Sequence, residues 1–273
     1  MYIDDNSDFG TYKPKQIVTI IIKITRSIGQ TWIAKRFIFL LRRIALLLSK
    51  QCIDTVLFNC KMRLYTKGNV CEKRALFAPQ IFESYERDFI YKNAKDGSIF
   101  IDIGSNVGLY SLSVGDSYKN YKETRIHAIE PHPKLFQRLF YNSSLNPNIP
   151  IKTHNFAIMD KNEGFYLNID EDNLGQTTIS DSGKTKVEAK TLETFINDQN
   201  IKKITALKID VEGNEEKVLL PFLKEENRKL FPEIIIIENN KSSWDKDLIE
   251  KLINFGYSLN KKTRMNYILK LRK

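Results

Sequence analysis

The sequence contains little cysteine and no long apolar run. Its three cysteines, Cys52, Cys60 and Cys71, lie too far apart for a paired zinc motif and are too few for a disulfide framework. No segment has the roughly 20 consecutive apolar residues of a transmembrane helix. The first ten residues, MYIDDNSDFG, are acidic and polar, unlike a secretory signal. We therefore expect a cytoplasmic protein with reduced thiols.

The chain also lacks internal repeats and low-complexity tracts. Its 273 residues are enough for one sizeable domain with an appendage, but few for two separate cores. A composition of 42% hydrophobic and 28% charged residues is ordinary for a globular protein and does not indicate disorder. We therefore expect one main hydrophobic core.

Positive charge is concentrated near the N-terminus. Fourteen Lys and Arg residues lie within residues 13–74 against only Asp54 and Glu72, so this segment carries +12 and the rest of the chain −2. A basic, apolar helix is predicted from Ile33 to Lys50, within a basic helical extension over residues 1–80. Such a helix can lie on an anionic membrane surface through residues 17–50, at the inner face of the membrane. The favoured interpretation is that it packs on the following domain or on a second subunit, with its cations solvated. The sequence does not fix the oligomeric state.

Residues 81–273 alternate between short apolar strands and helical stretches, which is typical of an α/β fold with a mostly parallel sheet covered by helices on both faces. Helices are expected to begin near Asn106, Pro133, Leu192, Asn214 and Trp244. A β-rich insertion is expected at about residues 160–190. The seven predicted strands are Ser98–Ile103, Arg125–Glu130, Ile151–Ala157, Ile204–Asp210, Glu233–Glu238, Tyr257–Asn260 and Asn266–Leu271.

The segment FIDIGSNVG, residues 100–108, combines an apolar strand with an acid and two glycines at its carboxyl end. Ligands bind at this edge of open α/β sheets. Gly104 allows the backbone to approach a ligand, Gly108 allows close packing, and the following helix offers free N–H groups to an anion. Asp102 suits an ammonium group. A ligand with both charges is an amino acid moiety, such as the methionine part of S-adenosylmethionine.

A second acid supports this interpretation. Glu130 ends the next predicted strand, 28 residues after Asp102, where a carboxylate can accept hydrogen bonds from both ribose hydroxyls. A dehydrogenase that binds NAD through the same turn would need G-x-G-x-x-G. Residues 104–109 read GSNVGL, with Asn106 in place of the second glycine. The turn therefore favours the sulfonium donor.

Three charged residues alternate along the segment ALKIDVEGN: Lys208, Asp210 and Glu212. Buried charges are costly without partners, so either Lys208 pairs with Asp210 or Glu238, or the group is catalytic. Asp210 or Glu212 is the predicted general base, with Lys208 beside them. Asp210, Glu238 and Asn239 could form an oxygen-rich metal site, but we assign no metal ligands. His127 and His154 are reserve bases only, because each lies within a predicted strand.

These motifs resemble those of the FkbM-type methyltransferases over about Phe82 to Lys273. The resemblance rests on SYERDF at 84–89, FIDIGSNVGLYSL at 100–112, AIEPHPKLFQRLFYNSSLN at 128–146, NFAIMDKNEG at 155–164, KTLETFI at 190–196, LKIDVEGNEEKVL at 207–219 and PEIIIIEN at 232–239. It implies a Rossmann-like class I methyltransferase fold with an antiparallel final strand. It also implies S-adenosylmethionine as cofactor.

The resemblance further assigns roles to individual residues. Asp210 and Glu212 would face the methyl acceptor. Ser105 stands where the family has alanine, within the turn that binds the donor, and Glu193 stands where it has aspartate. The residues that would contact the donor are Asp102, Gly104, Ser105, Asn106 and Gly108 at the methionine part, Glu130 at the ribose, and Asn155 and Ala157 at the adenine.

The sequence thus predicts an O-methyltransferase that acts on a hydroxyl, with a sugar of a surface polysaccharide or a related natural product as acceptor. The alternative is a nucleic-acid-associated methyltransferase or binding module that uses the basic arm. We expect a small-molecule or glycan partner and no nucleic acid, because the basic segment has no aromatic-interleaved motif of the RNA-recognition kind.

Overall fold

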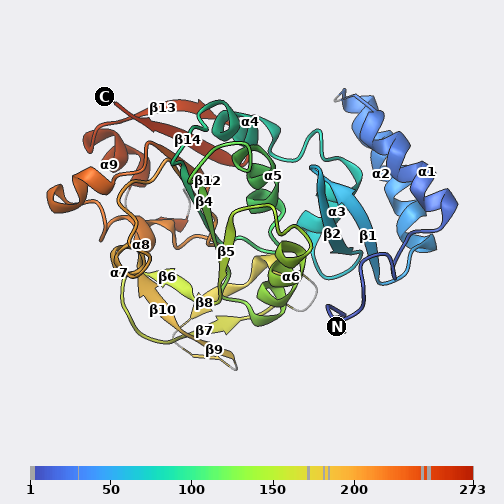
Figure 1. Ribbon diagram of the computed structural model, residues 1–273, viewed down its shortest axis with the longest axis horizontal. Helices are drawn as coiled ribbons and strands as arrows, with labels where there is room; N and C mark the ends of the chain where they lie inside the picture. The colour runs from blue at the N-terminus through green and yellow to red at the C-terminus, as the bar shows by residue number, and fades with distance from the viewer. Residues whose placement is uncertain are drawn as a thin grey trace.

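A seven-stranded sheet forms the centre of the molecule, with the order β13-β14-β12-β11-β3-β4-β5 (Figure 1). The computed structural model describes residues 4–29, 31–170, 173–180, 182–183, 185–240, 243–244 and 247–272. All seven predicted strands belong to this sheet, and β14 runs antiparallel to both of its neighbours, as the resemblance implied. The strands are β3 (Ile99–Ile103), β4 (Arg125–Ile129), β5 (Ile151–His154), β11 (Ala206–Ile209), β12 (Ile234–Glu238), β13 (Tyr257–Lys262) and β14 (Asn266–Leu271).

Helices cover both faces of the sheet because neighbouring residues of each central strand point to opposite sides. On β3, Phe100 belongs to one apolar cluster, while Ile99 and Ile101 belong to another. The first cluster contains residues of α4 (Ser84–Lys92), α5 (Leu109–Tyr118) and α6 (Pro133–Ser144). The second contains residues of α7 (Leu192–Asp198), α8 (Glu215–Leu219) and α9 (Leu248–Asn254). The predicted fold class is therefore confirmed.

Some boundaries differ from the prediction for local reasons. The strand predicted over Ile151–Ala157 is two strands, since β5 ends at His154 and β6 (Ala157–Met159) pairs with β10 (Ala189–Thr191) instead. The helix predicted from Asn106 begins at Leu109, because Asn106 and Gly108 have φ angles of 54° and 84°, outside the helical region. The helix predicted from Trp244 begins at Leu248.

The predicted β-rich insertion is present beyond the edge strand β5. β7 (Phe165–Asn168), β8 (Thr178–Ser180) and β9 (Thr185–Val187) form an antiparallel sheet in the order β8-β7-β9. A short 3₁₀ helix, η1 (Leu174–Gln176), lies between β7 and β8, and a second, η2 (Glu225–Leu230), precedes β12. The insertion thus adds a small sheet that is separate from the seven-stranded one.

The N-terminal extension is not entirely helical, which corrects the prediction. It contains α1 (Gln16–Ser27), α2 (Trp32–Leu48) and α3 (Val70–Phe77), but residues between α2 and α3 form an antiparallel hairpin of β1 (Cys52–Leu57) and β2 (Cys60–Tyr65). No helix in the described part of the chain is long and apolar enough to cross a bilayer. The extension therefore joins a helix pair to a small β unit.

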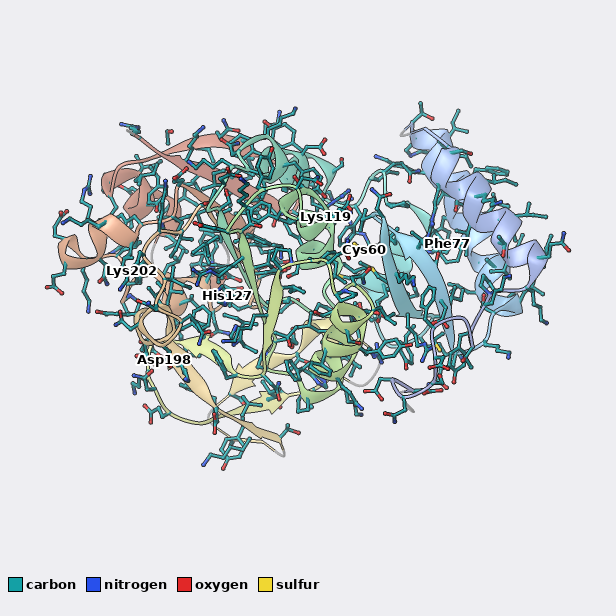
Figure 2. The ribbon with its side chains drawn as sticks, viewed as in Figure 1. Cys60, Phe77, Lys119, His127, Asp198 and Lys202 are labelled. Atoms are coloured by element: carbon teal, nitrogen blue, oxygen red, sulfur yellow. The ribbon has the colours of Figure 1, made fainter. Side chains whose placement is uncertain are left out.

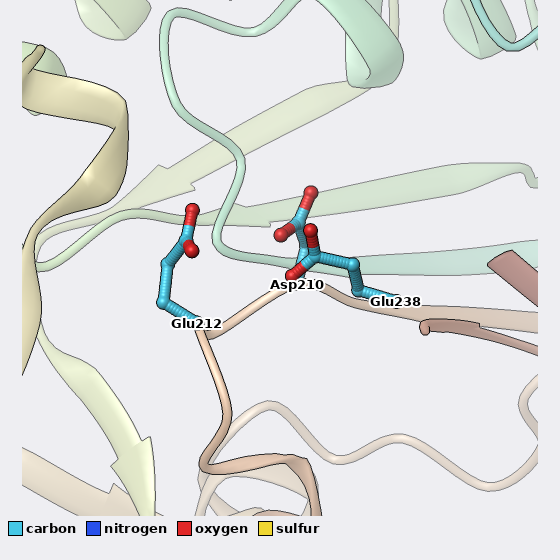
Figure 3. A group of neighbouring side chains, drawn as sticks. All are labelled: Asp210, Glu212 and Glu238. Carbon is cyan, nitrogen blue, oxygen red and sulfur yellow. The ribbon is translucent and has the colours of Figure 1, made fainter. Parts of the chain in front are cut away.

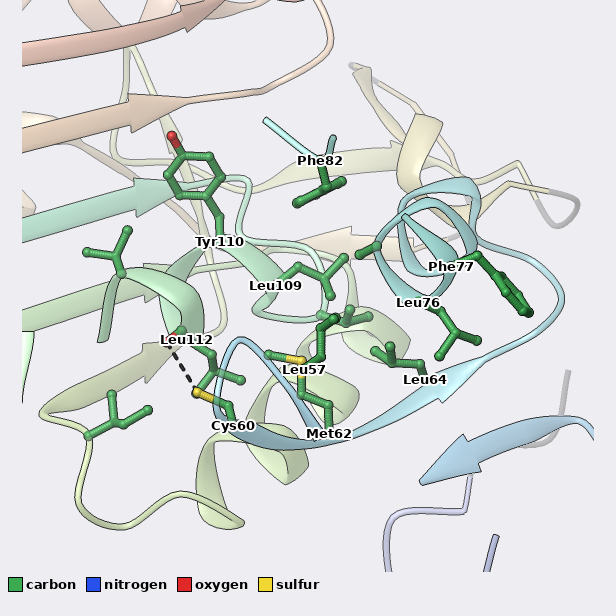
Figure 4. Packing of buried hydrophobic residues seen from close by; sticks show 14 of the residues in the cluster. Leu57, Cys60, Met62, Leu64, Leu76, Phe77, Phe82, Leu109, Tyr110 and Leu112 are labelled. Atoms are coloured by element: carbon green, nitrogen blue, oxygen red, sulfur yellow. Dashed lines mark hydrogen bonds between the residues drawn. The ribbon is translucent and has the colours of Figure 1, made fainter. Parts of the chain in front are cut away.

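Apolar packing joins the hairpin of the extension to the helices of the sheet. Leu57, Cys60 and Met62 lie in one cluster with Leu109 and Leu112 of α5 (Figure 4). The Cys60 thiol also donates a hydrogen bond to the Leu112 carbonyl, at 3.4 Å. Burying one such side chain contributes about 1.5–3 kcal/mol, so a contact of this extent fixes the hairpin firmly on α5.

Buried ion pairs reinforce the same contact. Arg138 Nη1 on α6 lies 2.8 Å from Glu72 Oε2 on α3, and both side chains are buried. The Tyr65 amide donates to the other Glu72 oxygen at 2.7 Å. Within the hairpin, Arg63 pairs with Asp54 at 2.7 Å. Residues 52–77 thus share a core with the sheet, whereas the proposed domain division at residue 80 stays a prediction.

Candidate active site

A cavity of about 280 Å³ lies at the carboxyl ends of the central strands. This is close to the lower end of the range typical of small-molecule sites, about 300–1,000 Å³. Its wall includes residues of the strand ends, the extension and the insertion, and also Phe82, Glu83, Leu109, Tyr110, Leu135, Met265 and Asn266. The strand ends contribute Asp102–Asn106, Ile129–Pro131, Ala157, Ile158, Lys208, Asp210–Glu212 and Glu238; the extension contributes Val70, Cys71 and Arg74; the insertion contributes Leu167, Asn173–Gly175 and Thr177.

The glycine turn after β3 lies directly against the end of β11. Gly104 has a φ of +79°, and a Cβ atom added there would lie 1.9 Å from the Asp210 carbonyl oxygen. No other residue fits this contact. The Ser105 hydroxyl donates to the carbonyls of Asp102 and Ile129, at 2.8 and 3.0 Å, so the serine braces the turn where the family has alanine.

Gly108, a predicted donor residue, does not line the cavity. It precedes α5 with a φ of +84°, and an added Cβ would lie 2.7 Å from Leu139 of α6. Gly108 therefore allows close packing, as the sequence predicted, and the element packed against it is α6. A direct contact with the donor stays a prediction.

Among the residues that the structure describes, two buried polar atoms in the cavity wall have no hydrogen-bond partner. They are Asp102 Oδ1 and the hydroxyl of Tyr110. The other Asp102 oxygen accepts from the Ser111 hydroxyl at 2.5 Å. Burial raises the pKa of Asp102, while Lys208 and Ser111 oppose the increase. A carboxylate that is buried with a free acceptor fits a ligand ammonium group, which would satisfy that oxygen and stabilise the charge.

Glu130 occupies the position predicted for the ribose contact. Its two carboxylate oxygens accept hydrogen bonds from the backbone amides of His132 and Asn106, at 2.9 and 2.8 Å, and each retains a second acceptor site. Burial raises the pKa of Glu130 to about 8 against the effect of these amides. The geometry fits a pair of hydroxyl donors.

The two residues predicted to border the adenine have different positions. Ala157 lines the cavity, as expected. Asn155 is exposed and outside the lining; its side-chain amide donates to the Glu130 and Pro131 carbonyls, at 2.8 and 3.2 Å. Asn155 therefore holds the backbone that carries Glu130, and an adenine contact stays a prediction.

Lys208 is buried and forms an ion pair. Its Nζ donates to Asp210 Oδ2 at 2.8 Å, which is one of the two pairings that the sequence left open. Burial lowers the pKa of Lys208, but the carboxylates of Asp210, Glu83 and Asp102 outweigh this effect and hold it above its usual value. Lys208 is thus a fixed positive charge at the centre of the acidic wall.

Glu212 follows on a tight turn with a φ of 52°. The buried carboxylate of Glu215 holds this turn, since it accepts from the amides of Val211 and Gly213 at 3.2 and 3.1 Å. Burial, with the nearby charges of Asp210 and Glu215, raises the pKa of Glu212 to about 7. A carboxyl group with this pKa can exchange protons at neutral pH.

Asp210, Glu212 and Glu238 come together at the strand ends, with ligand oxygens within 4.8 Å of one another (Figure 3). Burial, together with the charges of Asp210 and Glu212, raises the pKa of Glu238. Oxygen ligands of this kind suit Mg²⁺. However, Lys208 already neutralises Asp210, and a proton on Glu238 removes a second negative charge. The group could hold a cation, and Lys208 with a proton on Glu238 lowers the charge that such a cation would have to balance.

We therefore expect methyl transfer to be insensitive to removal of divalent metal. Turnover after EDTA treatment and buffer exchange should stay within about twofold of the untreated protein, because Lys208 and a proton on Glu238 already offset two of the three carboxylate charges. The measurement compares turnover with and without added MgCl₂. A loss after EDTA that Mg²⁺ restores would show that a cation is part of the site.

Sequence reasoning missed Glu83 in the cavity wall, and also Asn69 and Gly68, which link the elements around it. Glu83 precedes α4, and burial raises its pKa to about 7 although Lys208 opposes the shift. Asn69 caps α3 and donates to Asn106 Oδ1 at 2.6 Å, which joins the extension to the glycine turn. The Gly68 carbonyl accepts a hydrogen bond from the Leu174 amide at 2.9 Å, and this bond joins the extension to the insertion. The only signal in the sequence was the proximity of Glu83 to the SYERDF motif.

The histidines considered as reserve bases lie elsewhere. His127, labelled in Figure 2, stacks on His154 with ring centroids 5.3 Å apart, and both rings contact Phe195. Burial lowers the pKa of His127 to about 3 and that of His154 to about 4. Neither residue lines the cavity, so both are structural.

The strand order, the glycine turn and the acidic strand ends together define a Rossmann-like methyltransferase fold. More particularly, the sequence matches the methyltransferase FkbM domain over residues 102–259, and the chain belongs to that family. The resemblance is thereby confirmed, and with it the expectation of S-adenosylmethionine as the cofactor of this class.

The chain is also similar to individual known proteins. Methyltransferase 1 of Beauveria bassiana (strain ARSEF 2860) is 25% identical over 147 residues, which cover 45% of this chain and 58% of that protein. The chain thus matches somewhat more than half of that relative's length.

Two solved structures are similar at lower identity. An FkbM methyltransferase from Methylobacillus flagellatus KT is 16% identical with a TM-score of 0.44, over 74% of this chain and 54% of that one. M. capricolum TrmK, in complex with S-adenosyl-homocysteine, is 15% identical with a TM-score of 0.39, over 68% of this chain and 66% of that one.

Proposed function

We propose that this protein is an S-adenosylmethionine-dependent O-methyltransferase that acts on a hydroxyl group of a sugar or related natural product. The observation that carries the proposal is the position of Glu212. This proton-exchanging carboxyl group shares one cavity wall with the glycine turn and with the unpartnered Asp102 oxygen. Free cysteines at all three positions support a cytoplasmic location.

The donor-binding side consists of the strand ends of β3 and β4. Asp102 would hold the ammonium group, the turn from Gly104 to Asn106 would approach the methionine part, and Glu130 would accept from the ribose hydroxyls. The donor, when bound, supplies a methyl group on a positively charged sulfur. The negative wall of the cavity favours that charge, and the fixed backbone positions both reactants.

The acceptor side consists of the end of β11 and the residues that follow it. A protonated aliphatic hydroxyl is a poor nucleophile, so a base must remove its proton as the bond to carbon forms. Glu212 has a suitable pKa, whereas Asp210 is held by Lys208 and can orient the hydroxyl. The polar groups of Arg74 and Asn173 in the wall support a hydroxyl-rich acceptor such as a glycan.

The proposal is tested by incubating the full chain with methyl-labelled donor and a set of acceptors: free sugars, nucleotide sugars, lipid-linked glycans and an RNA. We expect label on a hydroxyl-bearing glycan as an ether that resists mild alkali. Label that alkali releases would indicate a carboxyl ester, and label on the RNA alone would favour the nucleic-acid alternative. Calorimetric titration with S-adenosylhomocysteine separates failure of donor binding from absence of the right acceptor.

A further inference from the structure

The helices α1 and α2 form an antiparallel pair at the outer end of the molecule, away from the large sheet (Figure 1). Each helix has a buried side, which includes Val18 and Ile22 on α1 and Ile38 and Ala45 on α2. The burial of these residues uses only one side of each helix. The other sides of both helices are therefore free to contact something else.

The free side of α2 is strongly apolar. It consists of five side chains at alternating spacings of four and three residues, so they form one continuous stripe along the helix. We name it the α2 stripe: Ile33, Phe37, Leu40, Ile44 and Leu47. All five are exposed, from Leu47 at 81% and Ile33 at 74% to Ile44 at 42%. Large exposed apolar patches mark interaction sites rather than ordinary surface.

The charge around the α2 stripe has one sign. Between Asp8 and Asp54 the sequence contains nine Lys and Arg residues and no acid. Arg36 and Arg43, seven residues apart and both exposed, follow the stripe along one side, two helical turns from each other. Arg26 is used internally, since it donates to the Leu76 and Val56 carbonyls. The remaining cations are available to an anionic partner.

Aromatic rings accompany these cations. Arg36 lies over the ring of Trp32 at 4.2 Å, and Arg42 over the ring of Phe39 at 4.7 Å. Trp32 is 66% exposed at the start of α2. Tryptophan and arginine side chains of this kind suit the boundary between headgroups and acyl chains, where one part of the side chain is apolar and the other is wet.

We propose that α1 and α2 dock on the surface of an anionic phospholipid bilayer, with the α2 stripe in the headgroup region and the cations on the lipid phosphates. A helix with an apolar stripe and a basic flank binds a membrane in this way, lying in its plane. This inference does not depend on the identity of the methyl acceptor. It does not require a spanning segment, which no described helix provides.

Charge argues against the other occupants. A two-fold contact between α2 stripes would bring Arg36 and Arg43 of one copy towards those of the other, with no acid from residues 9–53 to pair with them. A nucleic acid would satisfy the cations but would leave five apolar side chains against phosphates. Only a surface that is both anionic and apolar complements all of these residues.

The test is cosedimentation of the full chain with vesicles of phosphatidylcholine alone or mixed with phosphatidylglycerol. We expect binding to be about tenfold stronger to the anionic vesicles and to weaken with salt. Leu40→Glu/Ile44→Glu should reduce it at least about tenfold, and Arg36→Gln/Arg43→Gln should lower the preference for anionic lipid. Phe140→Glu, which alters an exposed aromatic residue on α6, is the matched control and should bind like the unaltered protein.

These substitutions lie on exposed positions, and circular dichroism checks that the variants fold. Equal binding by Leu40→Glu/Ile44→Glu and the unaltered protein would overturn the proposal, as would no binding to anionic vesicles at low salt. Analytical ultracentrifugation adds a further outcome. A dimer that Leu40→Glu/Ile44→Glu converts to monomer, without lipid binding, would show that a second copy covers the stripe.

Discussion

Glu212→Gln is expected to lower turnover by about 10²–10⁴-fold at saturating acceptor, which is the usual contribution of a general base. Glutamine keeps the size and hydrogen-bonding capacity of the side chain but cannot accept the proton. Since the tight turn around Glu212 is held by Glu215, the backbone should remain in place. The affinity for S-adenosylhomocysteine should change little, because Glu212 lies on the acceptor side.

The pH profile gives an independent readout for Glu212. The base must be ionised, and its pKa is about 7, so turnover should rise as the pH increases through 7 and then level off. This rise should be absent from Glu212→Gln. Glu226→Gln, which alters an exposed carboxylate on η2, is the control and should behave normally. If Glu212→Gln retains full turnover and the same rise, the base lies elsewhere, and Asp210→Asn becomes the next variant to measure.

Arg138→Met is expected to destabilise the protein by about 3–5 kcal/mol, because it leaves the buried carboxylate of Glu72 without its cation. The loss should appear as a lower midpoint of urea unfolding at pH 7. Lys95→Met breaks the half-exposed pair of Lys95 with Glu233 at 3.0 Å, and it should cost about 0–1 kcal/mol. Similar losses for the two variants would contradict the argument from burial.

The stability of Arg138→Met should also depend on pH in a defined direction. Burial raises the pKa of Glu72 in the folded protein, and loss of Arg138 raises it further. A carboxyl group with a raised folded pKa favours folding while it is protonated, and this contribution is lost as the pH increases. The deficit of Arg138→Met should therefore be smaller at pH 5 than at pH 7. The double variant Glu72→Leu/Arg138→Met should recover part of the stability.

The sheet was predictable from the sequence because each central strand is an apolar run with a polar residue at its carboxyl end. β11 and β12 illustrate this, with Asp210 just after one and Glu238 at the end of the other. The hairpin of β1 and β2 was not predicted, because its turn lacks a glycine. Phe58 and Asn59 adopt φ angles of 52° and 59° there, which asparagine tolerates but phenylalanine rarely does. The hydrogen bonds between β1 and β2, together with burial of the strand faces, outweigh the preference of phenylalanine for a negative φ.

The candidate site was predictable where its residues follow strands and not where they come from distant segments. Asp102, Glu130 and Lys208 were found because parallel strands bring their carboxyl ends to one edge. Asn69 and Arg74 come from α3, whose position depends on long-range packing against α5 and α6. The pattern of apolar residues within the α3 sequence does not predict which distant elements the helix packs against.

The close approach of Gly104 to the Asp210 carbonyl leaves no room for substitution at this point of the cavity, whereas other parts of the wall can change. The Gly104 backbone lies too close to the Asp210 carbonyl for a Cβ atom, so a substitution at Gly104 would displace the glycine turn and the end of β11 together. Other parts of the wall come from α3 and the insertion, which lie outside the large sheet. These parts of the wall can change shape while the distance between the donor turn and the end of β11 stays constant. The architecture therefore suits a lineage in which acceptors diversify around an unchanged transfer step.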